Sequence, residues 1–128
     1  MLTTAMAFFM HDAMDQLIEI DVPSRSLRRG DEIVRFTRSE FSLMLWLINR
    51  PGQTFGRDAL IAGIHGDDYP ATPRSIDVQV VGVRRKLGDL AGQLETVRGR
   101  GYRFRSVPGV AWRVVGENHV DNRPPDDG

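Results

Sequence analysis

Cysteine is absent from this chain of 128 residues. Disulfide bridges and thiolate metal sites are therefore excluded, and a reducing cytosol is the simplest setting for the protein. No apolar run is long enough to cross a bilayer. Residues 1–14 lack the basic start and the uninterrupted apolar core of a signal peptide, because Asp12 interrupts them. We therefore expect a single cytoplasmic domain with no membrane partner.

Residue types that carry catalysis or bind metals are few and scattered. The three histidines, His11, His65 and His119, lie far apart and lack the spacing of metal ligands. None of them has a spacing to a serine and an aspartate that suits a catalytic triad. Gly99-Arg100-Gly101 does not precede a helix, as a phosphate-binding loop would. We expect no catalytic residue, no metal and no cofactor.

Net charge is also zero, but the charges are unevenly distributed. Residues 1–23 hold four acidic and no basic residues, whereas residues 74–105 hold eight basic residues against three acidic ones. All of the eight except Lys86 are arginines, and the guanidinium fork suits paired contacts to phosphate or guanine. The basic stretch indicates a nucleic-acid partner, with a solvated surface as the plainer alternative.

The N-terminal part predicts a helical extension followed by a sheet. Residues 1–16 carry an apolar stripe from Met6 onward that continues to Leu17 and suits a short helix. That helix would pack on the sheet or form a dimer contact. Extended runs at 17–20, 26–28 and 32–36, separated by turn residues, predict a small antiparallel sheet.

Three helices follow in the sequence. The first begins at a capping box of Thr37 with Glu40 and ends before Pro51-Gly52. The second covers 57–64 behind a weak cap at Gly56. The third covers 73–87, with Thr72 as its cap, Pro73 at its first position and Gly88 after its end. The inward stripes are Phe41, Met44, Leu45 and Ile48; Leu60, Ile61 and Ile64; and Ile76, Val80, Val83 and Leu87.

The C-terminal third predicts a basic hairpin. Residues 94–98 and 102–107 are strand-like around Gly99-Arg100-Gly101. A sheet, three helices and a hairpin wing make an α+β winged helix-turn-helix, which we place at 17–107. The C-terminal extension, 108–128, contains a strand-like run at 110–115 and is expected to be largely disordered after 117.

Over roughly residues 17–106 the chain resembles the DNA-binding effector domain of OmpR/PhoB-type response regulators. The resemblance rests on several short runs that occur in order and at the family's spacings. They are Phe36-Thr37-Arg38-Ser39-Glu40-Phe41 with Leu45 and Leu47, Arg50-Pro51-Gly52, Gly56-Arg57 with Leu60, Arg74-Ser75-Ile76-Asp77-Val78, Arg84-Arg85-Lys86-Leu87, and Thr96-Val97-Arg98-Gly99-Arg100-Gly101-Tyr102-Arg103-Phe104.

The resemblance implies that the third helix enters the major groove of double-stranded DNA and that the wing reaches the minor groove with Arg98 and Arg100. It implies phosphate contacts from Arg74, Arg84 and Thr96, and base-edge contacts from Ser75, Val78 and Gln79. The expected DNA-binding residues are Arg74, Ser75, Val78, Gln79, Arg84, Arg85, Thr96, Arg98, Arg100 and Tyr102. It also implies a homodimer on DNA and a nucleoid location, and loop 65–71 is a candidate contact to RNA polymerase.

The chain departs from the family's pattern at three points. Nothing before Leu17 can house a receiver domain, so we expect no control by receiver phosphorylation. His65 replaces a tryptophan. Val81 and Gly82 stand where basic residues are usual, and we expect Gly82 on the exposed face of its helix. A glycine at that position marks either neutral drift of an exposed residue or a close approach of the backbone to DNA or to a partner. Gly82→Arg is expected to strengthen DNA binding.

Two functions follow from these features. The first is a DNA-binding transcriptional regulator, in which Val78 and Val81 touch thymine methyl groups. The second is a winged helix that binds RNA polymerase or another regulator through an apolar patch, with little or no sequence-specific reading of DNA.

Overall fold

The structure is a computed structural model, and it describes residues 16–64 and 72–116. The chain divides into two compact units, which are described separately. The sheet unit comprises Met1–Arg35 with Val107–Gly128, and the helical unit comprises Phe36–Ser106. The expected N-terminal helix, loop 65–71 and the expected disordered tail lie outside the described residues, apart from Gln16.

The sheet unit is a four-stranded sheet with the order β3-β2-β1-β7. As predicted, β1 (Gln16–Asp21), β2 (Ser26–Arg29) and β3 (Glu32–Arg35) pair antiparallel. The sheet is nevertheless mixed, because β7 (Val110–Val115) pairs parallel with β1 over its whole length. Strand β1 needs partners for its backbone groups on both edges, and the second partner comes from the far end of the chain, where local sequence pattern cannot indicate the pairing.

Strand β1 alternates between a buried and an outward face. Ile18 and Ile20 are fully buried, whereas Glu19 points to the other face. There Glu19 lies opposite both Arg28 and Arg113 in the strand register and forms an ion pair with each. Opposite charges on neighbouring strands stabilise the pairing modestly.

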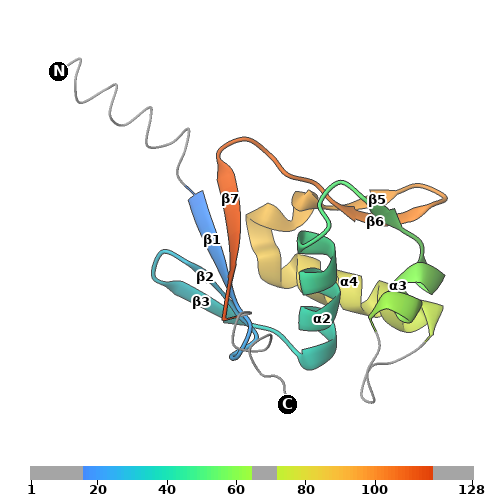
Figure 1. Ribbon diagram of the computed structural model, residues 1–128, viewed down its shortest axis with the longest axis horizontal. Coiled ribbons are helices and arrows are strands. Elements are labelled where there is room, and N and C mark those ends of the chain that lie inside the picture. Colours follow the sequence, from blue (N-terminus) through green and yellow to red (C-terminus); the bar gives the residue numbers. More distant parts are fainter. Residues whose placement is uncertain (1–15, 65–71, 117–128) are drawn as a thin grey trace, which may run out of the picture. The chain divides into compact units, whose positions relative to one another are not determined.

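The helical unit contains three helices and a three-stranded sheet (Figure 1). The helices are α2 (Arg38–Ile48), α3 (Arg57–Gly63) and α4 (Pro73–Leu87), followed by the 3-10 helix η1 (Gly88–Gln93). The sheet has the order β4-β6-β5, with β4 (Thr54–Phe55), β5 (Leu94–Val97) and β6 (Gly101–Phe104). The predicted helices and hairpin are confirmed, whereas β4 and η1 are too short for a sequence signal. None of the described helices is long and apolar enough to cross a bilayer.

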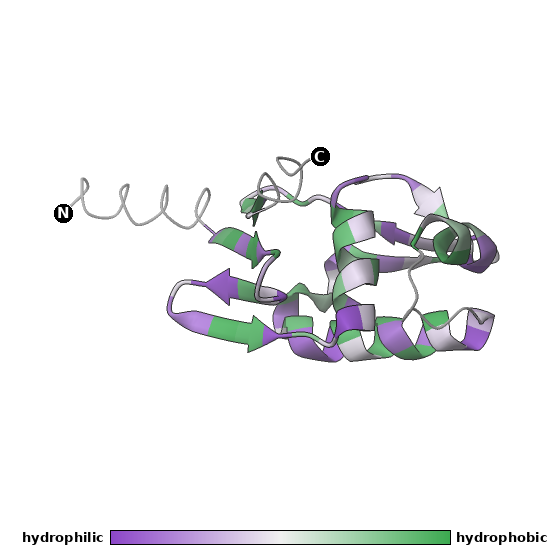
Figure 2. Cartoon of the chain, turned by 60° about the horizontal axis from the view of Figure 1, so that its bottom comes forward, coloured by the Kyte–Doolittle hydropathy of each residue, from purple (hydrophilic) through white to green (hydrophobic). Residues whose placement is uncertain are grey.

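The core of the helical unit forms where α4 packs against α2 and α3. Figure 2 shows hydrophobic and hydrophilic residues alternating around these helices, as expected for elements with one buried face. The predicted buried stripe of α4 is confirmed. In α2, however, Leu43 and Leu47 are buried while Leu45 is only half-buried. The buried residues of the two helices are Phe41, Leu43, Met44, Leu47, Ile48, Ile76, Val80, Val83 and Leu87.

One glycine allows β4 to approach the hairpin closely. Gly101 has a φ of +138°, and a Cβ atom there would overlap the carbonyl oxygen of Phe55. Backbone at this φ is essentially restricted to glycine. The attachment of β4 to β6 therefore depends on the missing side chain.

We expect Gly101→Ala to lower the free energy of unfolding by about 2 kcal/mol or more, because it adds both a strained φ and a backbone clash. Gly92→Ala is the matched control, since Gly92 in η1 has open space around its Cβ position and no positive φ. Urea denaturation measures both. Equal effects of the two substitutions would contradict the role of Gly101.

Candidate nucleic-acid interface

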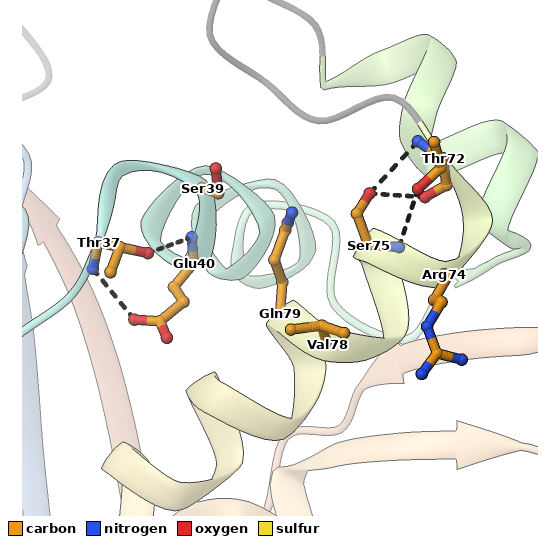
Figure 3. A pocket seen from close by; sticks show the side chains of 8 residues that line it. All are labelled: Thr37, Ser39, Glu40, Thr72, Arg74, Ser75, Val78 and Gln79. Atoms are coloured by element: carbon orange, nitrogen blue, oxygen red, sulfur yellow. Dashed lines mark hydrogen bonds between the residues drawn. The ribbon is translucent and has the colours of Figure 1, made fainter.

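The start of α4 is fixed by reciprocal hydrogen bonds between Thr72 and Ser75. The backbone N–H of Ser75 donates to Thr72 Oγ1 at 3.1 Å, and the backbone N–H of Thr72 donates to Ser75 Oγ at 3.3 Å. Ser75 Oγ also donates to the carbonyl of Thr72 at 2.7 Å (Figure 3). Ser75 was expected to meet base edges, but the structure shows its hydroxyl engaged in capping the helix.

The carboxylate of Asp77 joins α4 to two other elements. It accepts from Arg57 Nε of α3 at 2.8 Å and from the hydroxyl of Tyr102 of β6 at 2.6 Å. The hydrogen bond from Arg57, and then that from Tyr102, lowers the pKa of Asp77. Burial, together with the bond to Asp77, raises the pKa of Tyr102. A single ionised carboxylate thus fixes α3, α4 and the hairpin relative to one another.

Arg84 makes a second connection between α4 and the hairpin. Its Nε and Nη2 atoms donate to the carbonyl of Leu94 at 3.0 and 2.8 Å, and Nη2 also donates to Thr96 Oγ1 at 2.7 Å. The guanidinium lies 5.8 Å from the ring centroid of Tyr102. Arg84 and Thr96 were both expected to hold phosphates, and in the structure they hold each other.

The turn of the hairpin presents two arginines to solvent. Arg98 and Arg100 are exposed on either side of Gly99, whose φ is +75°. The backbone N–H of Arg100 donates to the carbonyl of Val97 at 2.8 Å and closes the turn. Because β5 and β6 are short, Arg98 follows Thr96 by two residues and Arg100 precedes Tyr102 by two, and the side chains of Thr96 and Tyr102 connect the hairpin to α4.

The expectation that Gly82 lies on the exposed face of its helix is wrong. Gly82 is buried, and a Cβ atom there would overlap Oε2 of Glu40. Glu40 Oε1 accepts from the backbone N–H of Thr37 at 3.0 Å and from Lys86 Nζ at 2.7 Å. The close approach at Gly82 is therefore made by a side chain of α2, which removes the basis for expecting Gly82→Arg to strengthen DNA binding.

The carboxylate of Glu40 is ionised in this position. Burial alone would raise its pKa, but the hydrogen bonds from Lys86 and Thr37 outweigh burial and hold the pKa of Glu40 below its usual value. The sequence indicated the capping box but gave no sign of the ion pair, because Glu40 and Lys86 lie on different helices.

A hollow of about 480 Å³ lies between the first turns of α2 and α4. Figure 3 shows Gln79 extending toward α2 between Ser39 and Ser75, while Arg74 points away from them. Gln79 is only 6% exposed, and its Oε1 has no hydrogen-bond partner. The residue expected to read bases therefore lies between two helices.

The predicted DNA-binding residues separate into three groups by exposure. Ser75 and Arg84 are half-buried, and Gln79 and Tyr102 are buried. The exposed ones are Arg74, Val78, Arg85, Thr96, Arg98 and Arg100. Residues that position this surface were missed from the sequence, because their partners are distant along the chain: Glu40, Arg57, Asp77 and Lys86.

Within residues 16–64 and 72–116, no group of three or more histidine, cysteine, aspartate or glutamate side chains is placed to hold a metal ion. The three histidines lie outside these residues.

Gly82→Ala should destabilise the native protein by about 1 kcal/mol. It displaces the Glu40 carboxylate from Thr37 and Lys86, and this loss exceeds the gain of up to about 1 kcal/mol from better helix propensity. In a Glu40→Ala background the same change should instead stabilise. Urea denaturation of the four proteins measures the coupling. Stabilisation by Gly82→Ala in both backgrounds would contradict the contact.

Stability should fall in acid because Asp77 and Glu40 both have lowered pKa values. Their contribution is complete above the unfolded carboxyl pKa of about 4 and is lost as the pH falls through the lower folded values. The free energy of unfolding, measured by urea denaturation at a series of pH values, should therefore drop below about pH 4. The double variant Asp77→Asn, Glu40→Gln should show a shallower drop, and an equal drop in both proteins would contradict the role of these two carboxylates.

The family model described as "Transcriptional regulatory protein, C terminal" matches residues 30–104. The phosphate regulon transcriptional regulatory protein PhoB of Rhizobium meliloti is 34% identical over 91 residues, which cover 70% of this chain and 40% of that protein. The chain thus spans less than half the length of this curated relative.

Two similar solved structures contain DNA. The DNA-binding domain of the response regulator AdeR, in complex with an intercistronic region, has a TM-score of 0.57 and 30% identity, covering 70% of this chain and 95% of that one. The RstA DNA-binding domain of Klebsiella pneumoniae, in complex with the RstA box, has a TM-score of 0.55 and 32% identity, covering 67% of this chain and 88% of that one. The winged-helix fold and the resemblance predicted from the sequence are confirmed.

Proposed function

Since the chain belongs to the family described as "Transcriptional regulatory protein, C terminal", we propose that it is a transcriptional regulator that binds double-stranded DNA. In this proposal α4 enters the major groove and the hairpin contacts the adjacent minor groove. The family is a class of regulators and not of enzymes. The similar domains of AdeR and RstA were solved with DNA.

The observation that carries this proposal is the rigid connection between α4 and a hairpin whose turn is cationic. Arg84 bonds to Leu94 and Thr96, and Tyr102 bonds to Asp77. Arg98 and Arg100 are thereby held at a fixed distance from α4 without taking part in the connection. Two basic elements at a fixed spacing suit two grooves of one duplex.

The roles within the expected set change accordingly. Arg74 and Arg85 on α4 and Arg98 and Arg100 on the wing contact phosphates or the narrow minor groove. Arg84, Tyr102 and Ser75 act by positioning these elements. Gln79 supports the contact between α2 and α4.

The broader expectations stay predictions. These expectations concern homodimer formation on DNA, contact with RNA polymerase and independence from receiver phosphorylation. None of the three rests on a contact among the described residues. The alternative function, a winged helix that binds a protein with little DNA reading, predicts no salt-sensitive binding to DNA. The experiment below separates it from the proposal.

DNA binding should weaken steeply with salt, because each phosphate contact releases condensed counterions. Fluorescence anisotropy with a pool of genomic duplexes should show a linear fall of log affinity with log salt. Arg85→Ala and Arg100→Ala should each weaken binding and reduce the slope by about one. Arg35→Ala, an exposed arginine of the sheet unit, is the control and should change neither. No salt-sensitive binding to any duplex would disprove the proposal.

A further inference from the structure

The exposed side chains of α4 beyond its first residue form one stripe along the helix. They are Arg74, Val78, Val81 and Arg85, spaced by four, three and four positions. Val78 and Val81 are 60% and 58% exposed. A single exposed hydrophobic residue needs no explanation, but here two adjacent valines lie between two arginines on the helix proposed to enter DNA.

The other polar side chains of α4 are engaged within the protein or buried. Ser75 caps the helix, Asp77 holds Arg57 and Tyr102, and Arg84 holds the hairpin. Lys86 is paired with Glu40, and Gln79 is buried. Between the two arginines, the exposed side chains of this fully described helix are therefore the two valines, and the unpartnered oxygen of Gln79 is buried.

The spacing of the stripe matches the major groove. Arg74 and Arg85 are eleven residues apart, which corresponds to roughly 16 Å along a helix. The major groove is about 12 Å wide and is bordered by phosphates on both sides. The two guanidinium groups can reach opposite borders of the groove while the valines face the base edges between them. This charge complementarity favours DNA over a protein as the occupant of the stripe.

We propose that Val78 and Val81 recognise the 5-methyl groups of pyrimidines on neighbouring base pairs. The inference rests on the proposed function and names the feature of the duplex that α4 selects. The methyl group of thymine, or of 5-methylcytosine, is the apolar group that base pairs present in the major groove. A valine placed against an amino or carbonyl group would instead leave that group without its hydrogen bond.

The relative position of the two valines determines the spacing of the methyl groups. Residues three apart on a helix have Cβ atoms about 5–6 Å apart, and successive phosphates along a strand rise by about 3.4 Å. The two methyl groups therefore belong to adjacent or next-but-one base pairs. Gly82, which lies beneath Glu40, supplies no side chain that could form a hydrogen bond to guanine.

The experiment starts from a short duplex that the full chain selects from a random DNA pool. Each thymine of that duplex is replaced in turn by uracil, which removes only the 5-methyl group. We expect one or two positions at which the affinity falls by roughly threefold to fivefold, the effect of one methyl group. Replacing uracil by cytosine and by 5-methylcytosine at those positions, with guanine opposite, distinguishes the two sources of the methyl group.

Two valine variants link the effect to α4. Val81→Ala and Val78→Ala should each weaken binding to the thymine duplex and abolish the difference between thymine and uracil at one position. Both variants remove exposed atoms, and circular dichroism with thermal unfolding verifies that they fold. Ile33→Ala, which removes an equally exposed side chain of the sheet unit (57%), is the matched control and should preserve the difference.

The outcomes separate the inference from the function on which it rests. Loss of the thymine–uracil difference in the valine variants alone supports the inference. Salt-sensitive binding that is indifferent to every uracil substitution overturns the inference and leaves the proposed function intact. If the valine variants keep the full difference in affinity between thymine and uracil duplexes, the inference is likewise overturned and the proposed function stays intact. If the chain selects no duplex from the pool and instead binds a protein through Val78 and Val81, both the inference and the proposed function are overturned.

Discussion

The carboxylate of Asp77 joins three elements of the helical unit through hydrogen bonds. It accepts hydrogen bonds from Arg57 of α3 and Tyr102 of β6 while belonging to α4. Hydrogen bonds to an ionised acceptor are stronger than neutral ones, and here they join three elements whose sequence positions span 57 to 102. Arg84 adds a second connection from α4 to β5. The hairpin is therefore connected to α4 through both of its strands, by Leu94 and Thr96 of β5 and by Tyr102 of β6.

This constraint engages several basic and polar side chains in hydrogen bonds within the protein. An arginine that holds a backbone carbonyl and a threonine hydroxyl gives up hydrogen bonds when it turns toward a phosphate. In the proposed function, the surface that remains for DNA is smaller than the sequence indicates: two arginines and two valines on α4, and two arginines in the turn of the wing. In that proposal the positioning residues act on binding through the spacing of these groups.

Local signals predicted the parts of the fold that local physics determines. The capping box at Thr37 placed the start of α2, and the cap at Thr72, Pro73 at the first turn and Gly88 after the last turn placed both ends of α4. The pairing of β7 with β1 and the burial of Gly82 beneath Glu40 depend on segments far apart in the sequence. A periodicity argument assigns Gly82 to the outer face of an isolated helix, and only the neighbouring helix shows that this face is covered.

In the proposed function, the covering of Gly82 also bears on how α4 would distinguish one DNA sequence from another. A long polar side chain can adjust its conformation to reach a base edge, whereas a valine methyl group loses roughly a quarter to a half of its contact energy when a gap of about 0.5–1 Å opens. Recognition through valines therefore requires that the helix be held at a fixed depth in the groove. The Glu40–Lys86 pair on one side of α4 and the Asp77 and Arg84 connections on the other restrain the helix in this way. In the proposed mode of recognition, the attachment of α4 to its neighbours is therefore what allows the exposed valines to meet methyl groups at a fixed position in the groove.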